Sequence, residues 1–414
     1  MEKNKKDSKI NDLIEKEISR QKEGLTLIPS ENYASPEVLS VMATPLSNKY
    51  SEGYPGKRYY SGNLFIDEIE KTAIERAKRL FNADHANVQP HSGSQANEAA
   101  YLALLDPGDK VLALDLSAGG HLSHGAKINF SGRTYNFFHY GVSKENELID
   151  FNEVEEKALK FEPKLIIAST TSYSRILDFE KFREIADKVG AYLLADIAHI
   201  AGLVVAGIHP HPFPFADVVT TTTHKTLRGP RGGLILSKKE FSEKIDRAVF
   251  PGVQGGPLEH VIAAKAICFK EDLEDEFKEY QNQIALNARA MADVFKENNF
   301  RIVSGGTDNH LFIVDISSTE SSSMEIQDEL EKVGIFVNRN KIPFDQRSAF
   351  NPSGIRMGTP AITSRGLKEK ESKEVANLVS ELIKNIKSES VKEKVKERIK
   401  EISEEFPIYS NFEY

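Results

Sequence analysis

The stretch LIIASTTSYSRILDFEKFREIADKVGAYLLADIA, residues 165–198, decides the fold class of this chain. Two short apolar, strand-like runs, at 165–170 and 192–198, flank a stretch with helical periodicity at 178–190. A strand, a helix and a second strand in this order are typical of parallel pairing within one sheet. The stretch therefore predicts an α/β fold.

The same alternation extends along the chain on both sides of this stretch. One helix candidate lies at 93–105, and further strand candidates are NVQP at 87–90, VLALDL at 111–116, VVTTTTH at 218–224 and GLILS at 233–237. Strands that alternate with helices predict a largely parallel sheet covered on both faces. Ligands of such sheets bind outside the carboxyl ends of the strands, where the polar residues of this sequence also collect.

After Pro257 the pattern becomes mainly helical. A long helical stretch runs from Glu259 to about Asn298, strand candidates follow at 310–316 and 335–340, and two charged helices reach Glu405. We expect three parts, which are an N-terminal helical arm (1–30), a large domain (31–279) and a smaller C-terminal α/β domain (280–414).

The N-terminal arm carries an apolar stripe at helical spacing, formed by Ile10, Leu13, Ile14 and Ile18. This stripe predicts an amphipathic helix. Because the segment has no core of its own, we expect it to pack on another element or on a partner subunit.

Composition excludes several broad classes. The chain has 414 residues, a formal net charge of -8 and one cysteine, Cys268. The negative charge argues against broad nucleic-acid or membrane binding, and one cysteine cannot form an intrachain disulfide. No stretch has the form of a signal peptide or approaches the ~20 apolar residues of a membrane helix. We therefore expect a soluble, cytoplasmic protein.

The strongest chemical signal is TTTTHKTLRGPRGG, residues 220–233, which delivers Lys225 to a strand end beside a glycine-rich turn. A lysine amine is nucleophilic only when neutral, and burial or a nearby cation favours that form. Asp196 ends the neighbouring strand candidate. An amine and an acid at adjacent strand ends fit pyridoxal phosphate, whose ring nitrogen needs a carboxylate partner. A solvated surface lysine and an aspartate helix cap are the alternatives.

Two further segments suit parts of the same cofactor. HSGSQANEAA, at 91–100, places Ser92, Gly93 and Ser94 at a helix start, where free N–H groups bind anions. An ordinary serine cap is the alternative there. GGHLSHG, at 119–125, presents His121, which suits stacking on a flat ring, and His124, which we interpret as structural. No cysteine or acidic cluster completes a metal site with them, so no metal is expected.

Two polar segments suit substrate recognition. SGIRMGTPA, at 353–361, holds Arg356 in an apolar, glycine-flanked setting suited to bidentate capture of a carboxylate. A structural salt bridge is the competing interpretation. NKYSEGYPGKRYYSG, at 48–62, offers tyrosines, Glu52 and Arg58 around glycines and a proline. This segment is either a surface loop, a partner-binding loop or part of the site.

Taken together, eight segments in order resemble the serine hydroxymethyltransferase family over nearly the whole chain. They are LIPSENYASPEVL, NKYSEGYPGKRYYSGN, HSGSQANEAAY, LDLSAGGHLSHG, DIAHIAGLV, VVTTTTHKTLRGPRGGLIL, FPGVQGGP and SGIRMGTPA. The resemblance implies the pyridoxal-phosphate-dependent transferase fold of fold type I, the aspartate aminotransferase type. That fold has a large domain with a mostly parallel seven-stranded sheet and a smaller C-terminal α/β domain.

The resemblance also implies cofactor contacts. Lys225 would form the Schiff base with pyridoxal 5'-phosphate, Asp196 would pair with its ring nitrogen, and His121 would stack on the ring. Ser92, Gly93 and Ser94 would hold the phosphate. The remaining matched cofactor positions are Thr171, His199, Thr222, His224 and Arg231, together with Tyr50, Gly255 and Gly256, which would reach over from the neighbouring subunit of a homodimer, possibly within a tetramer.

The substrates follow from the same resemblance as L-serine, glycine and tetrahydrofolate, with methylenetetrahydrofolate as the one-carbon product. Arg356 would clamp the amino-acid carboxylate, assisted by Ser30 and His199. Glu52 would transfer protons, and Tyr60 would shape the site from the neighbouring subunit. The matched folate contacts are Leu116, Gly120, Leu122 and Asn340.

Some positions depart from the family's usual residues. They are Ala118, Val253, Thr171 and the segment NRNKIPFDQRSAFNP at 338–352. These departures leave the cofactor positions intact and bear more on folate than on serine. One alternative is a folate-independent aldolase that cleaves threonine-like β-hydroxy amino acids. A second is a cofactor-binding or RNA-binding relative without turnover, which the acidic charge and Lys225 disfavour.

Overall fold

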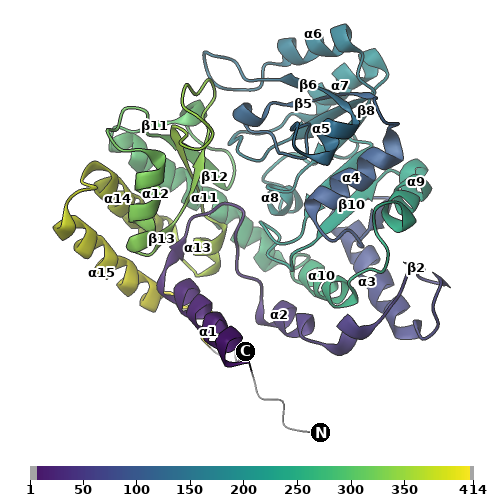
Figure 1. Cartoon of the computed structure of the whole chain (residues 1–414), viewed down its shortest axis with the longest axis horizontal. Coiled ribbons are helices and arrows are strands. Elements are labelled where there is room, and N and C mark those ends of the chain that lie inside the picture. Colours follow the sequence, from purple (N-terminus) through teal and green to yellow (C-terminus); the bar gives the residue numbers. More distant parts are fainter. Residues whose placement is uncertain (1–6, 411–414) are drawn as a thin grey trace.

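A seven-stranded, mostly parallel sheet forms the centre of the larger part of the molecule (Figure 1). The computed structural model describes residues 7–410. In spatial order the strands are β4 (His85–Asn87), β10 (Gly233–Ser237), β9 (Val218–Thr222), β8 (Tyr192–Asp196), β7 (Leu165–Ser169), β5 (Lys110–Leu114) and β6 (Asn136–Tyr140). Only β10 runs antiparallel to its neighbours. The predicted α/β class is confirmed.

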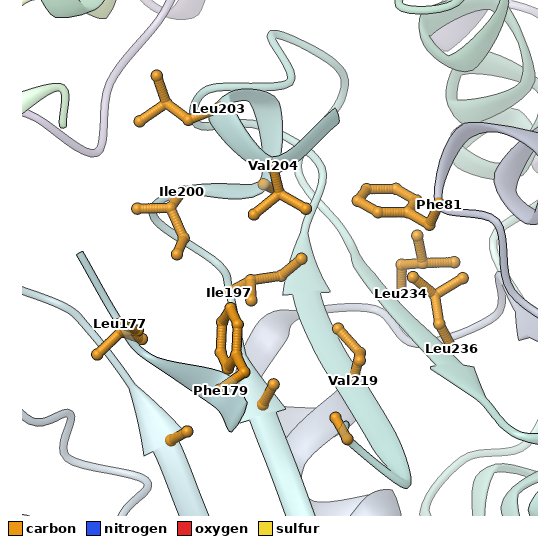
Figure 2. Packing of buried hydrophobic residues seen from close by; sticks show 14 of the residues in the cluster. Phe81, Leu177, Phe179, Ile197, Ile200, Leu203, Val204, Val219, Leu234 and Leu236 are labelled. Atoms are coloured by element: carbon orange, nitrogen blue, oxygen red, sulfur yellow. The ribbon is translucent and has the colours of Figure 1, made fainter. Parts of the chain in front are cut away.

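Successive residues of these strands enter two different cores, one on each face of the sheet. In β8, Leu193 and Ala195 join one apolar cluster while Leu194 joins the other. Because strand side chains alternate between faces, a strand buried on both sides needs a continuous apolar run. Figure 2 shows part of the first cluster, in which Phe81 lies beside Leu234 and Leu236 of β10. Packing on both faces thus holds the residues at the strand ends in place.

A smaller antiparallel sheet has a core of its own. Its strands, in spatial order, are β11 (Arg301–Ile302), β12 (Leu311–Asp315), β15 (Gly354–Gly358) and β14 (Asn338–Asn340). The helices that contribute to its core are α11 (Asp275–Glu297), α12 (Ser323–Lys332), α13 (Pro360–Ser364), α14 (Glu369–Lys384) and α15 (Glu389–Glu405). The smaller sheet and these helices lie to the left of the seven-stranded sheet in Figure 1.

The N-terminal region is attached to this smaller sheet. Helix α1 (Ser8–Glu23) contacts α15, and β1 (Leu25–Thr26) pairs in parallel with β13 (Ile335–Phe336). The predicted amphipathic helix is therefore present. Its apolar stripe stays largely uncovered within this chain, since Ile10, Leu13 and Ile14 are about half exposed.

The remaining elements connect or cover the two sheets. They are α2 (Pro36–Met42), β2 (Gly53–Tyr54), β3 (Lys57–Arg58), α3 (Leu64–Leu80), α4 (Gly93–Leu104), α5 (Phe130–Thr134), α6 (Phe151–Phe161), α7 (Phe179–Val189), α8 (Ala201–Val205), α9 (Ser242–Arg247) and α10 (Glu259–Glu271). No helix within residues 7–410 is both long and apolar enough to span a membrane.

Three predicted elements differ from the structure. The helical stretch from Glu259 is two helices, because α11 starts anew after Glu274 with Asp275 and Glu276 in its first turn, a favourable place for acids. Strand β4 ends at Asn87, where NVQP begins, so Val88, Gln89 and Pro90 lie outside the strand. The single strand predicted at 335–340 is two strands of different sheets, β13 and β14. Strands β6 and β15 were not predicted.

Candidate active site

A cavity of about 390 Å³ opens at the carboxyl ends of β8 and β9, the position expected for a ligand of such a sheet. It gathers most of the predicted cofactor and amino-acid residues in one place. Its lining includes Ser30, Ser92, Gly93, Ser94, His121, Thr171, Asp196, His199, Thr222, His224, Lys225, Arg231 and Arg356. We call this cavity the Lys225 pocket.

Lys225 lies half-buried in the turn that follows β9. Burial lowers the pKa of its amine to about 8, and the nearby guanidinium groups of Arg356 and Arg231 act in the same direction, while Asp196 opposes them. An amine with a pKa near 8 is partly neutral at physiological pH. Lys225 is therefore a usable nucleophile without any further base.

Asp196 is the last residue of β8 and keeps its negative charge despite burial. Burial alone would raise the pKa of its carboxyl group, but hydrogen bonds from His124 and Asn97 outweigh this effect and hold the pKa below its ordinary value. His124 Nε2 lies 3.0 Å and Asn97 Nδ2 2.9 Å from Asp196 Oδ2. The site thus presents a fixed carboxylate that suits a protonated ring nitrogen.

The start of α4 lines one end of the Lys225 pocket and has the features of an anion-binding site. Ser92 caps this helix, because its hydroxyl accepts a hydrogen bond from the backbone N–H of Gln95 at 3.2 Å. A side chain at Gly93 would lie only 2.7 Å from Thr222 of β9, so the glycine lets the helix start approach the strand closely. The first N–H groups of α4 have no partner within the helix, and Ser94 lines the same pocket as Thr222 and Lys225.

Arg356 enters the Lys225 pocket from β15 of the smaller sheet. Its Nε donates to Asn338 Oδ1 at 3.1 Å and its Nη1 to the carbonyl oxygen of Thr171 at 2.8 Å. No carboxylate within residues 7–410 forms a salt bridge with it, although the residue is only 9% exposed. Burial lowers the pKa of its guanidinium to about 10, so it stays charged at neutral pH. A buried cation without an acidic partner is suited to bind a ligand carboxylate.

Three histidines of the Lys225 pocket are held in the neutral form. Burial lowers the pKa of His121 to about 4 and that of His224 to about 3, and it places the pKa of His199 well below the usual value. The His199 ring stacks on His310, with 5.4 Å between ring centroids. Neutral imidazoles can stack on an aromatic ring or exchange hydrogen bonds without adding a positive charge.

A second group of predicted residues does not line the Lys225 pocket of the same chain. Tyr50 and Tyr60 pack edge to face with ring centroids 5.0 Å apart, and a side chain at Gly256 would lie 3.3 Å from the Tyr50 ring. A side chain at Gly255 would lie 3.1 Å from the Glu52 carboxylate. The structure therefore brings segment 48–62 and Gly255–Gly256 together, but away from Lys225.

Salt bridges and a hydrogen bond to carboxyl groups hold segment 48–62, which carries most of this second group, in place. Arg58 forms salt bridges with Asp67 at 2.9 Å and with Glu70 at 2.6 Å. The Ser51 hydroxyl donates to Glu259 Oε1 at 2.5 Å, and burial raises the pKa of Glu259 to about 7. Segment 48–62 is thus anchored by a compact polar network that has more acids than bases.

The predicted folate contacts form a third location. Leu116 and Leu122 are about half exposed, and Gly120 packs so tightly that a side chain there would lie 2.2 Å from the Leu114 carbonyl oxygen. Asn340 lies on β14, where its amide donates to the Lys341 carbonyl. None of these four residues lines the Lys225 pocket.

Sequence reasoning missed several residues that hold the site together. Asn97 donates to both Asp196 and Ser123, and it accepts a hydrogen bond from Thr220 at 2.6 Å. His124 is buried and bonded, as expected of a structural histidine, but one of its partners is Asp196. A polar Asn97 within the otherwise apolar face of α4 was the available signal.

The comparison with known proteins agrees with this geometry. The family model described as serine hydroxymethyltransferase matches residues 3–379. The chain belongs to that family. Two curated proteins named serine hydroxymethyltransferase, from Mycoplasma capricolum subsp. capricolum and Mycoplasma mycoides subsp. mycoides SC, are each 56% identical to it, and each alignment covers 98% of both chains. Membership of the family also confirms fold type I.

Enzymes of this family depend on pyridoxal 5'-phosphate and use tetrahydrofolate as cosubstrate. The Lys225 pocket fits that cofactor. It offers a lysine amine of lowered pKa, a fixed carboxylate at Asp196, a helix start for the phosphate and neutral imidazoles beside the ring. His224 Nδ1 is buried and has no hydrogen-bond partner among residues 7–410, which leaves it free to contact a ligand.

Proposed function

We propose that this chain catalyses the reversible transfer of a hydroxymethyl carbon from L-serine to tetrahydrofolate, giving glycine and 5,10-methylenetetrahydrofolate. The observation that carries the proposal is Arg356, a buried cation without an acidic partner, in the same pocket as Lys225 and Asp196. This arrangement can hold an amino-acid carboxylate beside a cofactor lysine. Membership of the family supports the same reaction.

The cofactor would be held by residues of one chain at both of its ends. Lys225 would bind its aldehyde carbon covalently, Asp196 would pair with its ring nitrogen, and His121 would stack on its ring. Ser92, Gly93 and Ser94 would hold the phosphate, with Thr171, His199, Thr222 and His224 along the walls. When bound, pyridoxal phosphate supplies a ring that accepts electrons as a bond to the amino-acid α-carbon breaks.

Arg356 would fix the substrate carboxylate, with Ser30 and His199 beside it. Fixing the carboxylate orients the bond between the α- and β-carbons, and such positioning lowers the barrier before any proton moves. Because Asp196 remains a carboxylate, it stabilises a positive charge on its partner nitrogen throughout.

We further propose that Glu52, Tyr50, Tyr60 and Gly255–Gly256 act in the pocket of a neighbouring subunit of a homodimer. Two observations support this arrangement. These residues cluster together away from the Lys225 pocket of their own chain. The tyrosine rings are also strongly exposed, at 54% for Tyr50 and 48% for Tyr60, as expected of a surface that a second copy covers. Glu52 would then transfer protons between the hydroxymethyl group and folate.

Tetrahydrofolate would be contacted by Leu116, Gly120, Leu122 and Asn340. The half-exposed leucines support this assignment, since they offer apolar surface to a flat ligand. The separate hydrophobic cores of the larger and the smaller sheet support a division into a large domain (31–279) and a small domain (280–414). Leu25 and Leu27 of the arm (1–30) pack into the core of the smaller sheet. We also propose a cytoplasmic location, which a single buried cysteine suits.

The test is the visible absorption spectrum of the purified protein loaded with pyridoxal phosphate. We expect a new long-wavelength band that becomes strong only when glycine and tetrahydrofolate are both present. A spectrum that responds to glycine but is indifferent to tetrahydrofolate would favour the folate-independent aldolase. Absence of any cofactor band after addition of pyridoxal phosphate would overturn the proposal.

A further inference from the structure

Lys265, which forms no salt bridge with any carboxylate of residues 7–410, lies beneath the proposed phosphate end of the Lys225 pocket. Lys265, on α10, is only 1% exposed, and its Nζ donates to three carbonyl oxygens. These belong to Val88 at 2.6 Å, Gly233 at 2.7 Å and Pro90 at 3.1 Å. Burying an ammonium group without a carboxylate costs several kcal/mol, so an ordinary core position would hold an apolar side chain.

The three carbonyls belong to the two chain segments that frame the pocket. Val88 and Pro90 follow β4 and lead directly to Ser92, whereas Gly233 opens β10 after the turn that carries Lys225. These segments also bond to each other, since the N–H of Gly233 donates to the Pro90 carbonyl at 3.0 Å. Lys265 therefore connects residues 88–92, which we call the phosphate segment, to the start of β10, which follows the turn that carries Lys225.

The neighbouring glycines show how little space is available around this contact. A side chain at Gly233 would lie 2.3 Å from the Ser92 carbonyl oxygen, and one at Gly232 would lie 2.5 Å from Lys265 Cε. Two successive glycines thus leave room for both the ammonium group and the phosphate segment. The junction is built around the lysine side chain.

The protonated form of Lys265 fits this site. Burial lowers the pKa of its amine to about 7 and so opposes the charged form, whereas Glu70 and the three carbonyl acceptors favour it. Three acceptors need three N–H donors, which an ammonium group supplies and a neutral amine does not. Its positive charge also reaches the pocket, because it helps to lower the pKa of His224 after the larger effects of burial, Arg231 and Lys225.

We propose that Lys265 is a positioning residue for the cofactor phosphate. It fixes the carbonyls of Val88 and Pro90, which precede Ser92, together with that of Gly233, and it adds positive charge behind the anion. It does not touch the cofactor. The inference rests on the proposed assignment of Ser92, Gly93 and Ser94 to the phosphate.

The experiment compares the binding of pyridoxal phosphate and of pyridoxal, which lacks the phosphate, to the apoprotein. We expect Lys265→Met to weaken pyridoxal phosphate roughly ten- to a hundred-fold and to leave pyridoxal within about two-fold, since only the phosphate depends on this charge and geometry. Lys265→Gln, which keeps N–H donors without the charge, should fall between. Lys270→Met, an exposed lysine on the same helix, is the matched control.

Each remaining outcome counts against the inference. An equal loss of affinity for both ligands, or no loss for either, would reduce Lys265 to a core residue, as would failure of both variants to fold. Ser94→Ala separates this inference from the proposal beneath it. If that variant leaves the ratio of the two affinities unchanged, the phosphate assignment fails; if it lowers the ratio while Lys265→Met does not, only the role of Lys265 fails.

Discussion

The Lys225 pocket and segment 48–62 differ in how much of a site one chain completes. Within the pocket, residues from both sheets converge, and Lys225, Asp196 and Arg356 line one cavity. Segment 48–62 is just as firmly anchored, through Arg58 and Glu259, but it presents Glu52 and two tyrosines away from that cavity. A loop that is anchored in this way but lines no part of the Lys225 pocket within residues 7–410 supports our proposal of a site shared between copies.

The largest effect is expected from Lys225→Ala, which removes the only covalent attachment that we assign to the cofactor. Activity should be lost entirely, while the fold persists because the half-buried side chain makes no contribution to either core. After borohydride treatment, mass spectrometry should find cofactor fixed to the wild-type chain and none on the variant. Covalent label on the variant would place the attachment at another lysine.

A hybrid dimer tests the second region directly. Homodimers of Lys225→Ala and homodimers of Glu52→Gln should each be inactive. A doubly tagged hybrid, with one subunit of each variant, should recover about half of the wild-type activity. The reason is geometric, since one of its two pockets then combines an intact Lys225 with an intact Glu52 from the other subunit. A hybrid as inactive as its parents would mean that Glu52 serves its own chain.

The next effect concerns the link between the pocket and the substrate. Arg356→Ala should raise the serine KM and the glycine Kd roughly a hundred-fold, because two charge-assisted hydrogen bonds are lost. Retention of pyridoxal phosphate should change little. Arg356→Lys keeps the charge without the planar fork, so it should recover only part of the affinity. Parallel loss of substrate and cofactor would assign Arg356 a structural role.

The smallest effect is expected at Glu259, which anchors segment 48–62, and concerns the pH dependence of protein stability. The pKa of Glu259 rises from 4.5 to about 7 on folding, so its stabilising contribution is complete below about pH 4.5 and is lost as the pH rises toward 7. Glu259→Gln should therefore exceed the wild type in stability at pH 8 by on the order of 2 kcal/mol and match it at pH 4.5.

Urea unfolding at pH 4.5 and pH 8, at one protein concentration, measures this difference. Glu279→Gln, an exposed position on α11, is the control and should show no such pH dependence. A stability difference at pH 4.5 as large as at pH 8 would show that the amide changes packing and not charge.

Much of the fold was predictable from the sequence because the central strands are buried on both faces. Continuous apolar runs such as those of β7 and β8 are recognisable as strands, and the polar ends of β8 and β9 located Asp196 and Thr222. Strand β15 was missed because the glycines at both ends leave an alternating run of only three residues, Ile355, Arg356 and Met357, which is too short to identify a strand. Its place is decided instead by tertiary packing, since a side chain at Gly354 would meet the Asn340 carbonyl.

The site was predictable only as far as each residue carries its own chemical signal. Lys225 and Arg356 could be selected by type and context. The roles of Asn97 and Lys265 depend on partners far away in the sequence, such as Asp196 for Asn97 and Val88 for Lys265. A buried amide or ammonium looks like an ordinary surface residue until the fold supplies its hydrogen bonds.

The hydrogen bond from Arg356 to the Thr171 carbonyl joins the two halves of the molecule. Arg356 is carried by the smaller sheet, whereas Thr171 follows β7 of the larger one. A carboxylate that binds this guanidinium acts on both halves at once, so amino-acid occupancy and the relative posture of the two cores are thermodynamically linked.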